Sequence, residues 1–245
     1  MGFKLETTMG RAYEYRKARM FKRWGNMSKT FTRISKEIII CVKASGPDPA
    51  SNSRLRVLMQ NAKAANMPKD TVAGSIKKAV GKDQADIREF VYEGYAPHGI
   101  AVLVETASDN HTRTVANVRS YFNRTGGNLG TSGSVSFLFE HKCIFKVKGK
   151  PEIDIEDLEL SMIDAGAQEV FAEDENIIIS GDFEDFGTIQ KYLEDNSFEL
   201  ISAEFARIAT QTKELTPEQA AEVEKTLARF EDDDDVTNVF HNMVY

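Results

Sequence analysis

Residues 143–208 read CIFKVKGKPEIDIEDLELSMIDAGAQEVFAEDENIIISGDFEDFGTIQKYLEDNSFELISAEFARI. The spacing of apolar residues in this stretch changes repeatedly between the period of a strand and the period of a helix. The pattern predicts, in chain order, a strand at 143–148, a helix at 154–165, strands at 169–172 and 177–180, a helix at 183–195 and a strand at 198–208. This β-α-β-β-α-β order is typical of a ferredoxin-like domain, an antiparallel sheet with two helices on one face.

A second unit of similar kind is interrupted by this stretch. Its predicted elements are strands at 90–95 and 100–106, a helix from Thr112 to the Gly126-Gly127 pair, a strand at 135–140, a helix opened by a capping box at Thr216 and Gln219, and an edge strand at 236–241. The last helix and strand supply what the first four elements lack. We therefore expect residues 135–207 to be an acidic domain inserted into a central α/β domain of residues 82–134 and 208–245.

The N-terminal third has a different pattern. Apolar residues at intervals of three or four predict helices that begin near Ser28, Ser53 and Pro68. Residues 1–81 are thus expected to form a basic helical domain with an N-terminal arm. The predicted fold class is α+β, with a helical bundle followed by two ferredoxin-like α/β domains, one inserted in the other.

Charge is distributed unevenly along the chain, whose net charge is −7. Residues 1–80 contain 17 Lys and Arg against 5 Asp and Glu, whereas residues 150–245 contain 6 against 26. A basic module of this kind binds a phosphate backbone by releasing counterions, and an acidic module is repelled by it. The opening third is therefore predicted to contact a polyanion.

The candidate phosphate-binding residues are the basic side chains of this opening third. They are Arg11, Arg16, Lys17, Arg19, Lys22, Arg23, Lys29, Arg33, Lys36, Arg54, Arg56, Lys63, Lys69, Lys77 and Lys78. Aromatic residues such as Trp24 lie among the first of them. These rings either stack on bases or anchor the arm to the helices, and packing is the favoured interpretation of Trp24.

Motifs for metal or cofactor chemistry are missing from the sequence. Cys41 and Cys143 are 102 positions apart, and the four histidines show no metal-binding spacing. The glycine-rich segment 126–133 lacks the Lys-Ser/Thr of a P-loop and is predicted to be a tight loop. The acidic run 232–235 is predicted to be solvated surface. We therefore expect no metal, no cofactor and no catalytic residue.

Three other classes of function receive little support. No stretch is apolar enough to span a membrane, and the cysteine usage favours a reducing cytosol. A nucleic-acid-cleaving site built on Glu93, Glu105 and Asp109 is the remaining enzyme alternative. A further alternative is a protein-interaction scaffold whose basic domain docks an acidic partner.

Several motifs together resemble one family, the YebC/PmpR family of bacterial regulatory proteins, which also includes a mitochondrial translational activator. The motifs are Gly46-Pro47-Asp48-Pro49 with Asn52 and Arg54-Leu55-Arg56, the run AKAANMPKD at 62–70, YEGYAPHG at 92–99, Asp109-Asn110 with Arg113-Thr114-Val115, and Gly126-Gly127-Asn128-Leu129-Gly130 before Gly133-Ser134-Val135. The family's usual Gly-His-Ser-Lys-Trp opening is replaced here by residues 9–16. This difference is typical of a divergent branch.

The resemblance implies a three-domain cytoplasmic protein with two α/β domains around a central cleft. Members are mostly described as probable transcriptional regulators that bind promoter DNA, and others as ribosome-associated factors that aid translation of proline runs. With the charge distribution, this leads to our prediction of a non-enzymatic nucleic-acid-binding regulator. DNA and RNA, including ribosomal RNA, both stay open as targets, because backbone contacts do not read base sequence. Neither a membrane nor a small-molecule substrate is expected, and the oligomeric state is not predicted.

Overall fold

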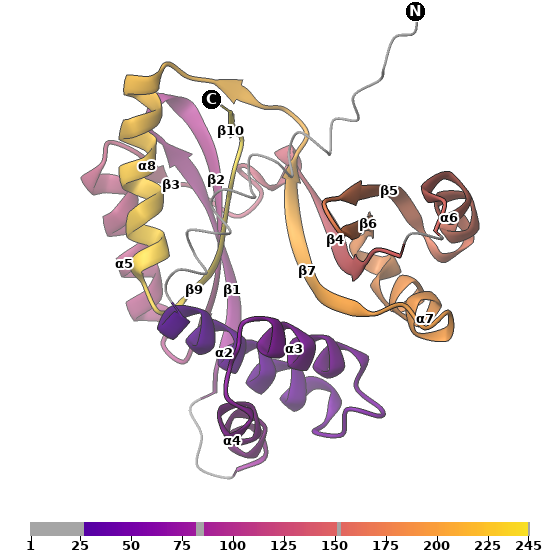
Figure 1. The fold of residues 1–245 in the computed structure, drawn as a ribbon. Helices are drawn as coiled ribbons and strands as arrows, with labels where there is room; N and C mark the ends of the chain where they lie inside the picture. The colour runs from indigo at the N-terminus through magenta and orange to yellow at the C-terminus, as the bar shows by residue number, and fades with distance from the viewer. Residues whose placement is uncertain (1–26, 82–85, 151–152, 245) are drawn as a thin grey trace, which may run out of the picture. The chain divides into compact units, whose positions relative to one another are not determined.

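A computed structural model describes residues 27–81, 86–150 and 153–244 of the chain (Figure 1). The chain divides into two compact units. One contains residues up to 33 with 85–140 and 208–245, and the other contains 34–84 with 141–207. The three-domain division expected from the sequence stays a prediction. None of the helices in the described part of the chain has the length and apolarity needed to cross a bilayer.

The three N-terminal helices are confirmed as α2 (Met27–Ser45), α3 (Ser53–Ala64) and α4 (Lys69–Val80). The buried Asn52 side chain connects the first two. Its Oδ1 accepts from the N–H of Leu55 at 3.0 Å and so caps α3, while its Nδ2 donates to the carbonyl of Gly46 at 2.9 Å. This contact explains why a motif with Asn52 follows the Gly46-Pro47 turn.

The unit that contains residues 141–207 has the predicted β-α-β-β-α-β order. Its elements are β4 (Phe139–Lys148), α6 (Ile155–Met162), β5 (Ala167–Glu173), β6 (Asn176–Asp182), α7 (Phe186–Asp195) and β7 (Leu200–Ala209). The sheet order β5-β6-β4-β7 is that of a ferredoxin-like fold. Its core holds Phe145, Ile179 and Ile189 together with Val57 from α3. Helix α3 therefore belongs to the same packed unit as the inserted sheet.

The other unit is the interrupted one. Its elements are β1 (Arg88–Ala96), β2 (Ile100–Ser108), α5 (His111–Arg124), β3 (Asn128–Leu129), α8 (Pro217–Asp232) and β9 (Val236–His241), and its sheet order is β3-β1-β2-β9. Strand β9 pairs antiparallel with β2, and α5 and α8 lie side by side (Figure 1). The core includes Phe122, Leu227 and Phe230. Helix α8 and strand β9 therefore belong to the same compact unit as β1, β2 and α5.

The predicted strand at 135–140 is wrong. Residues Ser136–Leu138 form a 3-10 turn, and β4 begins only at Phe139 and continues through Lys148. The apolar residues of 135–140 mimic a strand, but the N–H groups of Val135 and Ser136 donate to the Glu93 carboxylate rather than to a neighbouring strand. The third strand of this sheet is instead the short β3 inside the glycine-rich segment.

Candidate nucleic-acid interface

Nine of the fifteen candidate phosphate-binding residues lie in the described part of the chain. They are Lys29, Arg33 and Lys36 on α2, Arg54, Arg56 and Lys63 on α3, and Lys69, Lys77 and Lys78 on α4. The other six, Arg11, Arg16, Lys17, Arg19, Lys22 and Arg23, lie outside the described residues, as does Trp24. The nine fall into two groups, those held by contacts within the chain and those exposed.

Lys29 and Arg33 attach the start of α2 to the end of α8. The Arg33 side chain is buried, and its Nε donates to the carbonyl of Val236 at 3.0 Å while its Nη2 donates to the carbonyl of Glu231 at 3.1 Å. Lys29 forms an ion pair with Asp232 at 2.6 Å. Because its guanidinium is buried on carbonyl groups, we leave Arg33 out of the proposed interface.

Arg56 and Arg54 pack α3 against the inserted sheet and its helices. Arg56 makes a bidentate pair with Glu194 of α7, with both N···O distances 3.1 Å, and also donates to the carbonyl of Pro49 at 2.7 Å. The guanidinium of Arg54 lies over the ring of Phe205 in β7, 4.2 Å from its centroid. Lys36 is partly buried on α2. Arg54 and Arg56 therefore already have structural roles.

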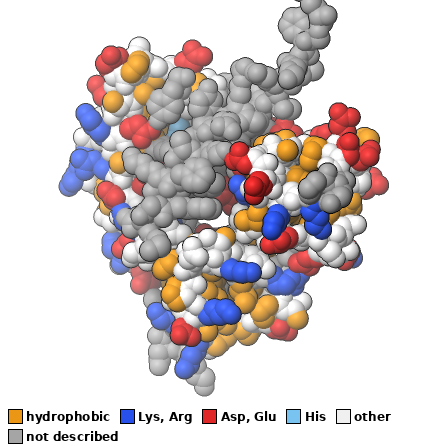
Figure 2. All heavy atoms as spheres, in the orientation of Figure 1, with side chains coloured by type: hydrophobic (Ala, Val, Ile, Leu, Met, Phe, Trp, Pro, Cys, Tyr) orange, Lys and Arg blue, Asp and Glu red, His pale blue; other side chains and the backbone are white. Residues whose placement is uncertain are grey.

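Four lysines are exposed and make no ion pair with any described residue: Lys63, Lys69, Lys77 and Lys78. Lys63 lies in the last turn of α3 and Lys69 is the first residue of α4, and four residues connect the two helices. Lys77 and Lys78 lie in the last turn of α4, whereas Lys69 begins this helix. Asp70 is the only acidic residue in 53–81. Figure 2 shows Lys and Arg side chains on the surface in this region.

The glycine-rich segment is held by a carboxylate from its own chain. Glu93 is buried, and its two oxygens accept from the N–H groups of Gly133, Val135 and Ser136, each at 2.8 Å. Burial alone raises the pKa of this carboxyl, but the backbone donors outweigh burial and lower it. The carboxylate thus occupies the Gly133 N–H of the segment, and the predicted tight loop contains the short strand β3 (Asn128–Leu129).

The acidic run at the end of α8 is not simply solvated, so that prediction is wrong for part of it. Asp235 is buried, and its Oδ2 accepts from Ser108 Oγ at 3.0 Å, Arg113 Nη2 at 2.8 Å and Thr114 Oγ1 at 3.2 Å. Asp235 therefore joins the end of α8 to β2 and α5. Asp232 of this run is exposed, as predicted.

Asp233 of the same run is also engaged. Its Oδ2 accepts from the hydroxyl of Tyr121 at 2.9 Å, and burial together with this contact raises the pKa of Tyr121 to about 12. Among the residues that the structure describes, no group of three His, Cys, Asp or Glu side chains is placed to hold a metal ion. The geometry of this region is that of a structural network.

His141 is a partly buried ring in the unit that also contains Arg54 and Arg207. It stacks on Phe183 with 3.9 Å between ring centroids. Burial lowers its pKa to about 4, and the positive charges of Arg207 and Arg54 act in the same direction. Because the folded pKa lies below the unfolded value of about 6.5, His141 contributes stability above that value which is lost as the pH falls towards 4.

We expect H141Q to have a shallower pH dependence of stability than the wild type. The free energy of unfolding, measured in urea at about pH 7, 6 and 5, should fall more steeply with decreasing pH for the wild type, because only its unfolded state gains the His141 proton in this range. Above about pH 5 the carboxyl of Glu93 stays ionised in both proteins. Parallel curves for the two proteins would contradict the assignment.

The fold and the site define an α+β protein with one ferredoxin-like unit, a second unit built on an antiparallel sheet, and exposed lysines on N-terminal helices. Residues 11–82 match the family description "TACO1/YebC protein N-terminal domain", and residues 87–243 match "TACO1/YebC second and third domain". The chain belongs to the TACO1/YebC family. The resemblance to the YebC/PmpR family found in the sequence is therefore confirmed.

Two relatives of high similarity share one name. A protein of Parabacteroides distasonis called "Probable transcriptional regulatory protein" is 58% identical over 235 residues, 96% of this chain and 97% of that protein. A Flavobacterium johnsoniae protein of the same name is 57% identical and covers 96% of this chain and 99% of its own. The crystal structure of a conserved hypothetical protein from Aquifex aeolicus superposes with a TM-score of 0.76 at 37% identity, covering 89% of this chain and 90% of that one.

Proposed function

We propose that this protein is a non-enzymatic transcriptional regulator that binds the phosphate backbone of DNA through its N-terminal helices. The observation that carries the proposal is the group of four exposed lysines, Lys63, Lys69, Lys77 and Lys78, with Asp70 as the only nearby acid along the sequence. Lysine ammonium groups with no internal partner are available to replace counterions on a polyanion. The relatives' name, "Probable transcriptional regulatory protein", supports a role in regulation.

The three carboxylates of the nucleic-acid-cleaving alternative all accept hydrogen bonds from other groups of the chain. The Glu93 carboxylate accepts hydrogen bonds from three backbone N–H groups. Asp109 accepts a hydrogen bond from Arg113 Nη2 at 3.1 Å. Glu105 accepts from the side-chain amide of Asn238 at 3.1 Å. These contacts support the non-enzymatic part of the proposal.

A cytoplasmic location is part of the same proposal. Cys41 and Cys143 are both buried free thiols. Burial raises the pKa of Cys143 to about 12, so this thiol stays protonated and unreactive. Free, buried cysteines of this kind are typical of proteins that work in a reducing compartment.

The test compares DNA with RNA under matched conditions. Labelled 30-base-pair duplex DNA, duplex RNA and single-stranded RNA of one sequence would be titrated with the full chain over a range of salt concentrations. We expect tight binding of the DNA duplex with a steep negative salt slope, because each phosphate contact releases counterions. Crosslinking in cells followed by sequencing of the attached nucleic acid gives the physiological target.

Each result of this test has a definite meaning. Enrichment of DNA regions near promoters supports the proposal. Enrichment of ribosomal RNA with no attached DNA would replace it by a role on the ribosome. A purified protein that binds none of the three nucleic acids would overturn both, and a partner retained after nuclease treatment of a lysate would then indicate a protein scaffold.

A further inference from the structure

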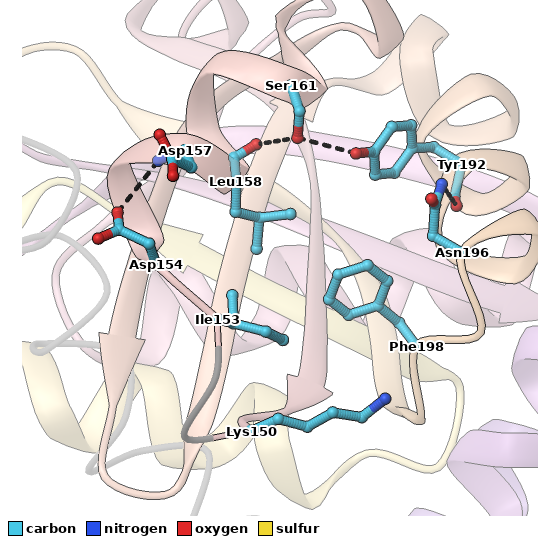
Figure 3. A pocket seen from close by; sticks show the side chains of 9 residues that line it. All are labelled: Lys150, Ile153, Asp154, Asp157, Leu158, Ser161, Tyr192, Asn196 and Phe198. Carbon is cyan, nitrogen blue, oxygen red and sulfur yellow. Dashed lines mark hydrogen bonds between the residues drawn. The ribbon is translucent and has the colours of Figure 1, made fainter.

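A groove lies between α6 and α7 of the inserted unit (Figure 3). None of the four exposed lysines described above lines it. It has a volume of about 460 Å³ and is open to solvent. The side chains of Ile153, Leu158 and Phe198 give it an apolar floor. At one end, Ser161 Oγ and the hydroxyl of Tyr192 are hydrogen-bonded at 2.8 Å, which joins the two helices across the groove.

The rim of the groove on the α6 side is acidic. Asp154 and Asp157 line it, and Asp154 is fixed because its Oδ1 accepts from the N–H groups of Glu156 and Asp157 at 2.9 and 3.2 Å. No cation among the described residues pairs with Asp157. The one basic side chain in the lining, Lys150, lies at the end away from Asp157 in Figure 3.

Two exposed large apolar side chains follow Asp157 along the chain without lining the groove, Leu160 on α6 and Ile163 at the start of η3 (Ile163–Ala165). Leu160 is 68% exposed and Ile163 is 56% exposed. Leu160 follows Asp157 by three positions, so it lies one turn further along the helix and next to the acidic rim. Large apolar side chains on a helix that also lines an apolar groove are typical of an interaction surface. The groove therefore combines an apolar floor with aspartates that pair with no cation among the described residues.

We infer that this groove binds a basic amphipathic segment of a partner protein, with apolar side chains on the groove floor and Lys or Arg on Asp154 and Asp157. The unit's charge supports the choice of partner, because residues 141–207 contain 17 Asp and Glu against 6 Lys and Arg. Such a surface repels nucleic acid and acidic proteins and attracts a cationic segment. An amphipathic helix laid in a groove is a recurring mode of peptide recognition.

The test uses a labelled 18-residue peptide of Leu and Lys with Leu at helical spacing, titrated into the full chain by fluorescence anisotropy. D157K reverses the rim charge, and S161W fills the groove. We expect each to weaken binding by about 10-fold or more, while E184K, an exposed charge reversal of equal size on η4 (Phe183–Asp185) outside the groove, changes it less than about 2-fold. Thermal unfolding of each variant shows whether it is folded.

The remaining outcomes separate this inference from other occupants and from the proposed function. A scrambled peptide of the same composition that binds equally well would indicate general charge attraction and overturn the inference. An effect of E184K equal to that of D157K would do the same. The inference would also be overturned if the peptide did not bind at all. A dimer in sedimentation that D157K dissociates would assign the groove to a second copy. Nucleic-acid binding is expected to be unchanged in S161W, so the two proposals fail independently.

Discussion

Replacing Lys63, Lys69, Lys77 and Lys78 together with glutamate is expected to weaken nucleic-acid binding by about 100-fold at moderate salt. Each of these side chains is exposed on α3 or α4. If all four contact phosphates, the slope of log K against log salt for duplex DNA should become shallower by about 3 to 4, since each contact contributes about 0.9. The measurement is a fluorescence titration with the 30-base-pair duplex at several salt concentrations.

A matched control has the same change of net charge at other exposed sites. It replaces Lys191, Lys225, Arg119 and Arg229 with glutamate. We expect less than about a 3-fold loss of affinity in this control, because only general repulsion is added. Equal losses in the two variants would show that α3 and α4 form no specific contact surface.

A companion variant addresses the N-terminal segment, which lies outside the described residues. Charge reversal of Arg16, Lys17, Lys22 and Arg23 to glutamate is likewise expected to abolish binding and to flatten the salt dependence, because these residues belong to the same basic third of the sequence. Unchanged affinity and salt slope in this variant would confine the interface to the helices.

The second large effect is expected for E93Q, which should lower the free energy of unfolding by about 3 kcal/mol near neutral pH. The substitution keeps the shape of the side chain but removes its charge and points an amide N–H at one or more of the backbone donors of Gly133, Val135 and Ser136. Hydrogen bonds to charged acceptors contribute about 1.5–3 kcal/mol each, and a buried unpaired donor adds its own cost. Urea unfolding with matched m-values measures the difference.

The pH dependence of this difference provides an internal check. The pKa of Glu93 is lowered in the folded protein, so its contribution is present above the ordinary carboxyl pKa and is lost as the pH falls below it. The gap between wild type and E93Q should therefore narrow in acid. E89Q, at an exposed carboxyl on the same strand, is the control and should change stability by less than about 0.5 kcal/mol. If the difference in unfolding free energy between wild type and E93Q does not change with pH, packing rather than the charge of Glu93 is its cause.

Prediction from the sequence succeeded where short-range patterns determine structure. The apolar spacing predicted the long helices and strands of both α/β units but not the two-residue β3, and the Thr216-Gln219 capping box is present with both reciprocal hydrogen bonds. It failed at 135–140, where the apolar residues have the spacing of a strand but a buried carboxylate forty positions away binds their N–H groups. No local signal marks Glu93 or Asp235 as anchors, because their partners come from other elements.

For the candidate interface too, the sequence and the tertiary structure determined different properties. The sequence alone determined that positive charge is concentrated in the opening third, since net charge depends only on composition. Tertiary structure decided which of those cations are available. Arg33 is buried on a carbonyl 203 positions away and Arg56 pairs with a carboxylate 138 positions away, while Lys63, Lys69, Lys77 and Lys78 meet no such partner among the described residues. Helical periodicity relates residues only three or four positions apart, so burial and pairing over such separations are set by the packed fold.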